Sequence, residues 1–546
     1  MKRVIFLIVL IGSLCVSCGD DFLEEEVNAN ITAEEYFLTK DGYESLVNST
    51  YSLLKDIYGQ DPYMFCSGTD LYSEGKDNGP EGLMRYSLLF PGSSGISELY
   101  KSCYRVIQKV NEGVFYSEST EQTDVINRRV GELKFLRANA YFLLVQTYGG
   151  VALVNEYFTT PVLSFERNTA QEVYAFIVSE LNEAVNLLPD EAFTGRANKR
   201  AAKNLLAKVH LTRGYETFAE TNDFELAAKL ADETIAGQGL DLSFEELWSP
   251  TADYREINEE TIFSVQFSIE SVAADVDNLG NKQANFFGPP MGGADVNGRN
   301  PYRTETLAIT QHALDLFIEQ DTRWETTFMS ERLNRYYNFY NFSETPEPED
   351  NEVAFYYAPA WASSDADLAA YAVLHPNAEI YPYGTYAARP NIEPDNATIP
   401  LRKFDDPNAP FADGNATSRR DVVIARLGET YLTAAEAYLQ SGNPALGLQR
   451  LNEVRRRAEV PAATLTDFDI DFILDERARE LLGEYYRWFD LKRTGKLVER
   501  ASLHNYLVEQ ANFNGANGEL KILRPIPQSA IDLNQNANFQ QNPAYR

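Results

Sequence analysis

The stretch RLGETYLTAAEAYLQSGNPALGLQRLNEVRRRA, residues 426–458, predicts two helices joined by a short turn. Apolar residues recur in its first half at steps of three and four, which places them on one helical face: Leu427, Tyr431, Ala434, Ala435 and Tyr438. Gly442 ends this helix, and Asn443 followed by Pro444 is typical of the start of the next one. The second helix has an apolar face of its own, formed by Leu448, Leu451 and Val454.

Further helices with the same apolar spacing precede this pair, at residues 126–150, 169–189, 198–214 and 223–237. Thr169 and Glu172 form the pattern of a capping box at the start of the second of them. Alanines at 207, 227, 228 and 231 allow neighbouring helices to approach closely. Antiparallel pairs of this size with short turns resemble tetratricopeptide repeats, whose pairs need neighbours to bury their faces.

About 190 residues separate the earlier helices from the pair at 426–458, so the helical scaffold contains an insertion. Residues 237–424 are rich in Pro, Gly, Asn and aromatic residues, and we expect mainly long loops there. Within them, residues 260–268 alternate weakly and predict a strand, and residues 311–328 predict one helix. Residues 60–100 predict a similar loop.

The N-terminus has the pattern of an export signal. Lys2 and Arg3 precede an apolar run at 4–14, which is shorter than the roughly 20 residues that a membrane-spanning helix needs. Cys15 and Cys18 have C-x-x-C spacing, but a redox or metal site lacks its usual context here. We therefore predict a signal peptide at 1–17, followed by a flexible linker at 18–30. The end of the segment resembles a bacterial lipoprotein box in which Cys18 is the lipid-attachment residue, and a plain secretory signal is the alternative.

The composition excludes several classes of partner. The 546 residues include 48 Lys and Arg against 81 Asp and Glu, a formal charge of -33. Such a chain is poorly suited to nucleic acid or to adsorption on anionic lipid, both of which need basic surfaces. With 44% hydrophobic residues it has enough apolar side chains for a large core, and its 32 Tyr and 31 Phe suit a carbohydrate-binding surface as well as a core.

No catalytic or cofactor motif stands out. The four histidines are far apart in sequence, and the patterns of zinc proteases, serine hydrolases and nucleotide-binding loops are absent. A carboxylate pair of the glycosidase kind is set by distance in space and stays open. We predict no enzyme, no cofactor and no metal, with one alternative: the acidic stretch 405–415, DDPNAPFADGN, either holds calcium or is a solvated loop.

Two further features leave alternatives open. Cys66 and Cys103 either form a disulfide or are separate buried thiols. Residues 473–497 predict a helix with charge pairs three or four apart, including Glu476 with Arg479 and Glu484 with Arg487. We interpret those charges as structural, with Trp488 packed into the bundle.

Several of these segments together resemble the SusD/RagB family of outer-membrane nutrient-binding lipoproteins. The matching stretches are residues 18–26, 99–114, 133–154, 197–214, 426–458, 476–497 and 523–545, and Tyr100 departs from the tryptophan expected there. The resemblance implies a mainly α fold, a SusD-like superhelix of tetratricopeptide-like pairs with loop-rich insertions and a few short strands. It implies one unit over 31–546, with the scaffold at about 31–236 and 425–546 and the insertion at about 237–424.

The resemblance also implies a function. A family member would capture glycan, or in some cases peptide, at the cell surface and pass it to a SusC-like TonB-dependent transporter, while its lipid holds it at the outer membrane. A surface glycoside hydrolase or a peptide-binding, RagB-like protein is the alternative. Sugar rings pack on exposed aromatic side chains, so we predict ligand contacts from five loop residues: Tyr72, Phe90, Phe287, Tyr337 and Trp361. Trp324 we expect in the core.

Overall fold

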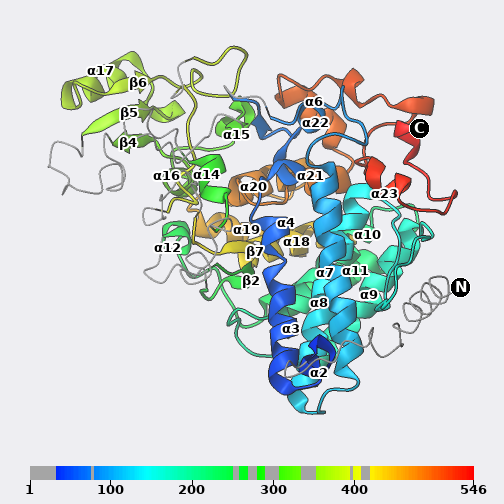
Figure 1. Cartoon of the computed structure of the whole chain (residues 1–546). Coiled ribbons are helices and arrows are strands. Elements are labelled where there is room, and N and C mark those ends of the chain that lie inside the picture. Colours follow the sequence, from blue (N-terminus) through cyan, green and yellow to red (C-terminus); the bar gives the residue numbers. More distant parts are fainter. Residues whose placement is uncertain are drawn as a thin grey trace, which may run out of the picture.

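The computed structural model describes residues 32–75, 79–249, 257–267, 280–288, 307–333, 352–393, 397–406 and 418–546. Within these ranges the fold is mainly helical, as predicted (Figure 1). The longer helices are α3 (Lys40–Ser52), α7 (Ile96–Ser117), α8 (Asp124–Tyr148), α9 (Ala170–Leu187), α10 (Lys199–Arg213), α11 (Asp223–Ile235), α18 (Leu427–Gln440), α19 (Pro444–Arg457) and α20 (Ile470–Leu481). Shorter ones include α2 (Ala33–Phe37), α12 (Phe244–Trp248), α17 (Asp365–Leu374), α21 (Arg487–Arg493), α22 (Leu497–His504) and α23 (Gln528–Asp532).

The long helices form one continuous stack. α7 packs on α8, α8 on α9, α9 on α10 and α10 on α11, each with its neighbour in the chain. α11 then packs on α18, and α18 on α19 and α20, so the stack continues across the predicted insertion (Figure 1). Stacked helix pairs bury their apolar faces only against such neighbours, which is why one large core runs through most of the bundle, with a smaller cluster formed by Leu211, Ala227, Ala228 and Ala437.

Local signals in the sequence define several helix ends. Thr169 and Glu172 form the predicted capping box at the start of α9. α8 ends at Gly149, whose φ of 76° is favourable only for glycine. The turn between α18 and α19 has Gly442 at a φ of 79° and Pro444 at the first turn of α19, as the sequence predicts.

Two strands in the segment between α11 and α18 pair with each other and bring the two ends of that segment together. β2 (Thr261–Val265), the strand predicted from alternation, pairs antiparallel with β7 (Val422–Arg426). β7 leads directly into α18, so the pairing fixes where the chain rejoins the stack. The exact limits of scaffold and insertion stay a prediction.

A small three-stranded sheet lies away from the stack, at the upper left of Figure 1. β5 (Val353–Tyr357) is central, with β4 (Glu331–Leu333) antiparallel on one side and β6 (Glu379–Tyr381) parallel on the other. Leu368 and Tyr371 of α17 pack on the sheet, and η4 (Ala360–Ala362) joins β5 to α17. The remaining strands, β1 (Tyr72–Ser73) and β3 (Ala308–Ile309), form a separate short pair.

The predicted single helix at 311–328 is wrong. The structure has two short helices, α15 (Gln311–Asp315) and α16 (Arg323–Thr327). Between them, the backbone N–H of Thr322 donates to the carbonyl of Ala458 on a distant segment. The Asp321 carboxylate binds both the backbone N–H and the guanidinium of Arg323, an arrangement that favours a turn over a continuous helix.

The predicted helix at 473–497 is likewise interrupted. α20 ends at Leu481, Gly483 adopts a φ of 81°, and α21 begins at Arg487. Lys403 donates to the carbonyls of Glu480 and Leu482, which satisfies backbone acceptors at the end of α20.

The loop predicted for residues 60–100 contains regular structure as well. α4 (Lys55–Tyr58) precedes it, and α5 (Tyr63–Cys66), β1 and α6 (Glu81–Arg85) lie inside it. A further short helix, α14 (Gln283–Phe287), falls within the predicted insertion. Residues 64–73 are buried, so this stretch is part of the core.

Cys66 and Cys103 are separate buried thiols without a disulfide, and burial raises the pKa of both.

The charges on α20 belong to a buried network, as the structural interpretation predicted. Glu476 and Glu480 are fully buried and both bind Arg323, at 2.8 and 3.2 Å. Burial alone would raise the pKa of Glu476, but neighbouring guanidinium groups, that of Arg323 first, lower it to about 2. Trp488 is fully buried, and its indole N–H donates to the hydroxyl of Tyr86. The pairing predicted for Glu484 with Arg487 is not found among the ion pairs, because Glu484 binds Arg426 and Arg487 binds Asp70.

Candidate functional site

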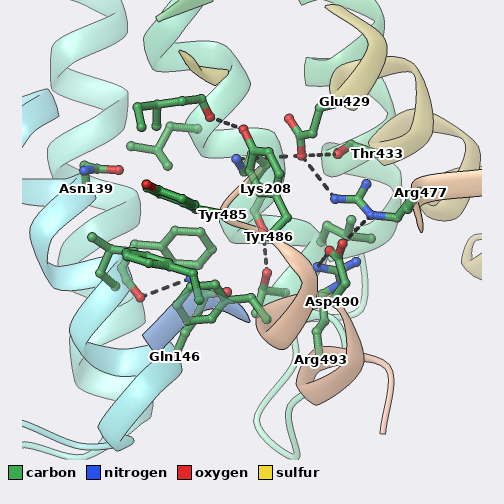
Figure 2. Close-up of a pocket in the computed structure, with 18 of the residues that line it drawn as sticks. Asn139, Gln146, Lys208, Glu429, Thr433, Arg477, Tyr485, Tyr486, Asp490 and Arg493 are labelled. Atoms are coloured by element: carbon green, nitrogen blue, oxygen red, sulfur yellow. Dashed lines mark hydrogen bonds and ion pairs between the residues drawn. The ribbon is translucent and has the colours of Figure 1, made fainter. Parts of the chain in front are cut away.

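One cavity lies inside the helical stack, and its size excludes a sugar. It measures about 60 Å³ and is enclosed by residues of α8, α10, α18, α20 and α21 (Figure 2). Its charges pair within the protein: Lys208 lies 3.7 Å from Glu429, and Arg477 lies 2.8 Å from Asp490. Such a volume accommodates a few water molecules, so we interpret this cavity as part of the polar core.

A pocket of about 520 Å³ opens beside the three-stranded sheet. We call it the aromatic pocket. Its walls come from the segment after α16, from β4 and β5, from η4 and from α17, and its lining residues are Glu325, Phe328, Met329, Ser330, Glu331, Leu333, Tyr356, Pro359, Trp361, Ala362, Tyr371 and Arg402.

Packed aromatic pairs hold the rings of this pocket in place. Trp361 contacts the fully buried Trp324 edge to face, with ring centres 5.1 Å apart. The Trp324 indole N–H donates to the Ser330 hydroxyl at 2.9 Å, which fixes the supporting ring. Tyr356 and Tyr371, which also line the pocket, stack with ring centres 3.7 Å apart and almost parallel. The half-buried Trp361 and Tyr371 rings are therefore each supported by packing on a buried aromatic ring.

Charged groups surround these rings. The Tyr371 hydroxyl donates to a Glu331 carboxylate oxygen at 2.7 Å. Burial and the nearby Glu331 raise the pKa of Glu325, against the opposing effect of Arg402. Within the described ranges, neither Glu325 nor the exposed Arg402 has a side-chain hydrogen bond or ion pair. The pocket therefore combines aromatic faces with carboxylate acceptors and a guanidinium donor.

This combination suits a polyol. The C–H face of a sugar ring packs on an aromatic ring, while its hydroxyl groups need donors and acceptors around it. A larger groove of about 720 Å³ lies between α7, residues 151–165 and α23, but its rim exposes apolar side chains such as Leu163 and Leu533. It offers fewer charged groups for hydroxyls, so the aromatic pocket is the better candidate.

The five predicted ligand residues occupy different positions. Trp361 lines the aromatic pocket. Tyr72 and Phe287 are core residues, 0% and 1% exposed, and contact each other. Other side chains cover both rings, so neither ring is accessible for packing against a sugar. Phe90 is 57% exposed but lies on the loop after α6, outside the pocket. Tyr337 lies outside the described residues.

Sequence reasoning missed Tyr371, Glu331 and Arg402. Nothing in their local pattern distinguishes them from other surface residues, since the pocket forms only when α17 folds over the small sheet. Trp324, expected in the core, is 1% exposed and lies directly behind Trp361.

The remaining predicted sites lie largely outside the described residues. Cys18 and most of the acidic stretch 405–415 lie outside the described residues, so lipid attachment and calcium stay predictions. Within the described ranges, no group of three or more His, Cys, Asp or Glu side chains is arranged to hold a metal ion. Among those same residues, no helix has the length and apolarity to cross a membrane.

Comparison with known proteins identifies the family. Residues 259–545, more than half of the chain, match the model of the SusD family. The chain belongs to the SusD family. Residues 92–211 match a second model, described as starch-binding associating with outer membrane. The family description thus joins glycan binding to an outer-membrane location.

Individual relatives support this assignment over most of the chain. A SusD-like protein of Bacteroides ovatus is 25% identical over 512 residues, which cover 90% of this chain and 82% of that protein. The starch-binding protein SusD of Bacteroides thetaiotaomicron is 26% identical over 79% of this chain and 76% of its own length. A solved structure of a laminarin-binding SusD-like protein superposes with a TM-score of 0.69 at 22% identity, covering 93% of this chain and all of that one. The superposition confirms the SusD-like helical fold.

Proposed function

We propose that this protein captures oligosaccharides in the aromatic pocket at the cell surface. One observation carries the proposal: in a chain of the SusD family, the rings of Trp361 and Tyr371 lie in one pocket with the unpaired Glu325 and Arg402. The names of two relatives, which bind starch and laminarin, support glucose polymers as the first ligands to test.

The experiment is a binding titration with malto- and laminari-oligosaccharides of two to seven units. Trp361→Ala removes one ring, and we expect at least a tenfold weaker affinity, since a well-packed tryptophan contributes about 2 kcal/mol or more to binding. Phe115→Ala is the control, because Phe115 is a 50% exposed ring on α7 outside the pocket. Equal affinity of the Trp361→Ala and control variants would contradict the proposed site.

Phe90→Ala tests the other exposed aromatic residue predicted from the sequence. The Phe90 side chain does not line the aromatic pocket, so we expect Phe90→Ala to leave the affinity for the oligosaccharides unchanged. A loss with Phe90→Ala and none with Trp361→Ala would move the site to the loop after α6.

Transfer to a partner is the second part of the proposal. We infer that the protein is held by a lipid at Cys18 at the extracellular side of the outer membrane, and passes ligand to a SusC-like TonB-dependent transporter. The family description of outer-membrane association supports this location. Mass spectrometry of the mature N-terminus tests the lipid, and co-purification of a transporter with the full-length protein tests the partner. An unmodified Cys18 would contradict the anchor.

We propose binding without turnover and without a cofactor. Hydrolysis is the alternative, because Glu325 and Glu331 line the same pocket and the pKa of Glu325 is raised, as in a glycosidase acid. Glu331, however, is engaged by the Tyr371 hydroxyl. Release of reducing ends during incubation with the same oligosaccharides would favour hydrolysis.

Binding of calcium by the acidic stretch 405–415 is a separate alternative. A lower unfolding temperature in EDTA would favour it.

Peptide binding, as in RagB-like proteins, is the remaining alternative. The same titration with a mixture of short peptides distinguishes it, since saturable binding of peptides but of no oligosaccharide would replace glycan as the ligand class.

A further inference from the structure

A second cavity adjoins the aromatic pocket. It measures about 570 Å³ and shares three lining residues with that pocket, Glu325, Leu333 and Arg402. We call it the adjoining cavity. The two hollows therefore lie against the same three side chains, next to each other on the protein.

The floor of the adjoining cavity is aromatic and its rim is polar. Phe244 and Trp248 of α12 form the floor, and both are at least 95% buried. The Lys403 ammonium lies 4.5 Å from the Trp248 ring centre, a cation–π contact that stabilises the position of the ring. Hydroxyl groups lie around the opening, from Ser243, Ser249, Thr322 and Thr326.

The cations of the adjoining cavity are mostly used by the protein itself. Lys403 binds Glu484 at 2.6 Å and Arg457 binds Glu260 at 3.0 Å, and both cations are buried. Burial lowers the pKa of Lys403 to about 8, although Glu484 opposes this shift. Among the described lining residues of the two hollows, Arg402 is therefore the cation left to contact a ligand.

The two hollows expose four carboxylates, compared with the one guanidinium of Arg402 that can contact a ligand. Glu245 and Glu459 lie on the adjoining cavity, Glu331 on the aromatic pocket, and Glu325 on both. The whole chain carries a formal charge of -33, which adds to the negative potential around the opening. A sulfated or uronic-acid glycan would be repelled here, whereas the hydroxyls of a neutral sugar can donate to the carboxylates and accept from Arg402.

We propose that the aromatic pocket and the adjoining cavity form one cleft that binds a neutral oligosaccharide lengthwise. Arg402 lies at the junction and donates to hydroxyls of the sugar units on either side. The ligand class is thus a neutral glycan long enough to fill both hollows. This inference rests on the proposed function, since it extends the same site.

The test compares short and long ligands with two variants. Thr322→Trp places a bulky ring on the exposed rim of the adjoining cavity and leaves the backbone bond of Thr322 to Ala458 intact. Titrations use laminari- and malto-oligosaccharides of two and six units. We expect Thr322→Trp to leave the affinity for two units unchanged and to weaken that for six units about tenfold. Thr123→Trp is the matched control, because Thr123 is an equally exposed threonine at the start of α8 and lines neither hollow, so this variant should bind both ligands as the unaltered protein does.

Failure of this inference and failure of the proposed function give different results. If Trp361→Ala abolishes binding while Thr322→Trp has the same effect at both lengths or none, the aromatic pocket stands and the extended cleft is overturned. If no oligosaccharide binds the unaltered protein, both are overturned. A hexameric oligogalacturonate that binds more tightly than the neutral hexamers would overturn the neutral ligand class.

Discussion

Arg426, the last residue of β7, lies 2.6 Å from Glu480 of α20, and both side chains are fully buried. Arg426 also binds the Glu484 carboxylate, with its Nε 2.9 Å from Oε2, and donates to the carbonyl of Glu480. The pair therefore links β7, the strand that leads into α18, to α20 of the helical stack.

Arg426→Met should destabilise the protein strongly. Removing one partner leaves Glu480 and Glu484 with less compensation in the core, and breaking a buried pair costs about 3–5 kcal/mol. The free energy of unfolding, from urea titration, measures the loss. The control is Arg128→Met, since Arg128 and Glu191 form a 3.5 Å pair that is about half exposed. That surface pair should contribute no more than about 1 kcal/mol, and a similar loss in both variants would contradict the role of Arg426.

Gly483→Ala should be more costly than substitution at a glycine with open surroundings. Gly483 has a φ of 81°, and a Cβ there would lie 2.2 Å from the Phe404 ring. Gly495 has a φ of 70° with nothing within 4 Å of such a Cβ. Both alanines bear the left-handed backbone cost of roughly 1–2 kcal/mol, and only Gly483→Ala adds a clash. Thermal unfolding of the two variants separates these effects, and equal unfolding temperatures would show that the Phe404 ring moves freely.

The helical stack could be predicted from the sequence because its signals are local. The capping box at Thr169 and the turn at Gly442 lie within a few residues of the helix ends that they define. The break after α20 depends instead on partners far along the chain, such as Lys403. Glu484 and Arg487 have the spacing of a helical pair, yet Arg487 binds Asp70, 417 residues away in sequence.

The candidate site shows the same limit. Tyr72, Phe287 and Trp361 all occur in stretches that lack helical periodicity, and no local feature tells which ring reaches the surface. Tyr72 is fully buried, and its hydroxyl accepts the N–H of Gly483, 411 residues away in sequence. The Trp361 side chain is half-buried, and its ring packs edge to face against Trp324.

The stability of the protein should fall as the pH is lowered from about 6.5 to 4. Burial lowers the pKa of His312 to about 4, with Arg500 and His504 acting in the same direction and Asp70 and Asp475 opposing. In that window the unfolded chain binds a proton that folded His312 does not, so unfolding is favoured by up to about 3 kcal/mol.

His312→Gln should remove this part of the pH dependence. The measurement is the urea midpoint of both proteins at pH 8 and pH 5. The difference between the two pH values should be smaller in His312→Gln, since glutamine does not titrate. An unchanged pH dependence would assign the effect to other groups.

The two thiols should be unreactive in the folded protein. Cys66 and Cys103 are fully buried and their pKa values are raised by burial, so little reactive thiolate is exposed. In a chain that begins after residue 18, a thiol reagent should modify two cysteines per molecule in guanidinium and almost none under native conditions. Detection of fewer than two thiols after denaturation without reductant would indicate a disulfide.

Tyr371 allows the hydroxyl and the ring to be tested separately. Its hydroxyl donates to Glu331 at 2.7 Å and its ring stacks on Tyr356, so the side chain both orients a carboxylate and forms a wall. Tyr371→Phe keeps the ring and removes the hydrogen bond that orients the Glu331 carboxylate. We expect the loss of this orientation to weaken one hydrogen bond from Glu331 to the sugar, and since such a bond contributes about 1 kcal/mol, the affinity for laminarihexaose should fall about fivefold. Tyr371→Ala removes the wall as well and should weaken binding further. If the two variants bind equally, the hydroxyl carries the whole effect and the stacked ring does not contact the sugar.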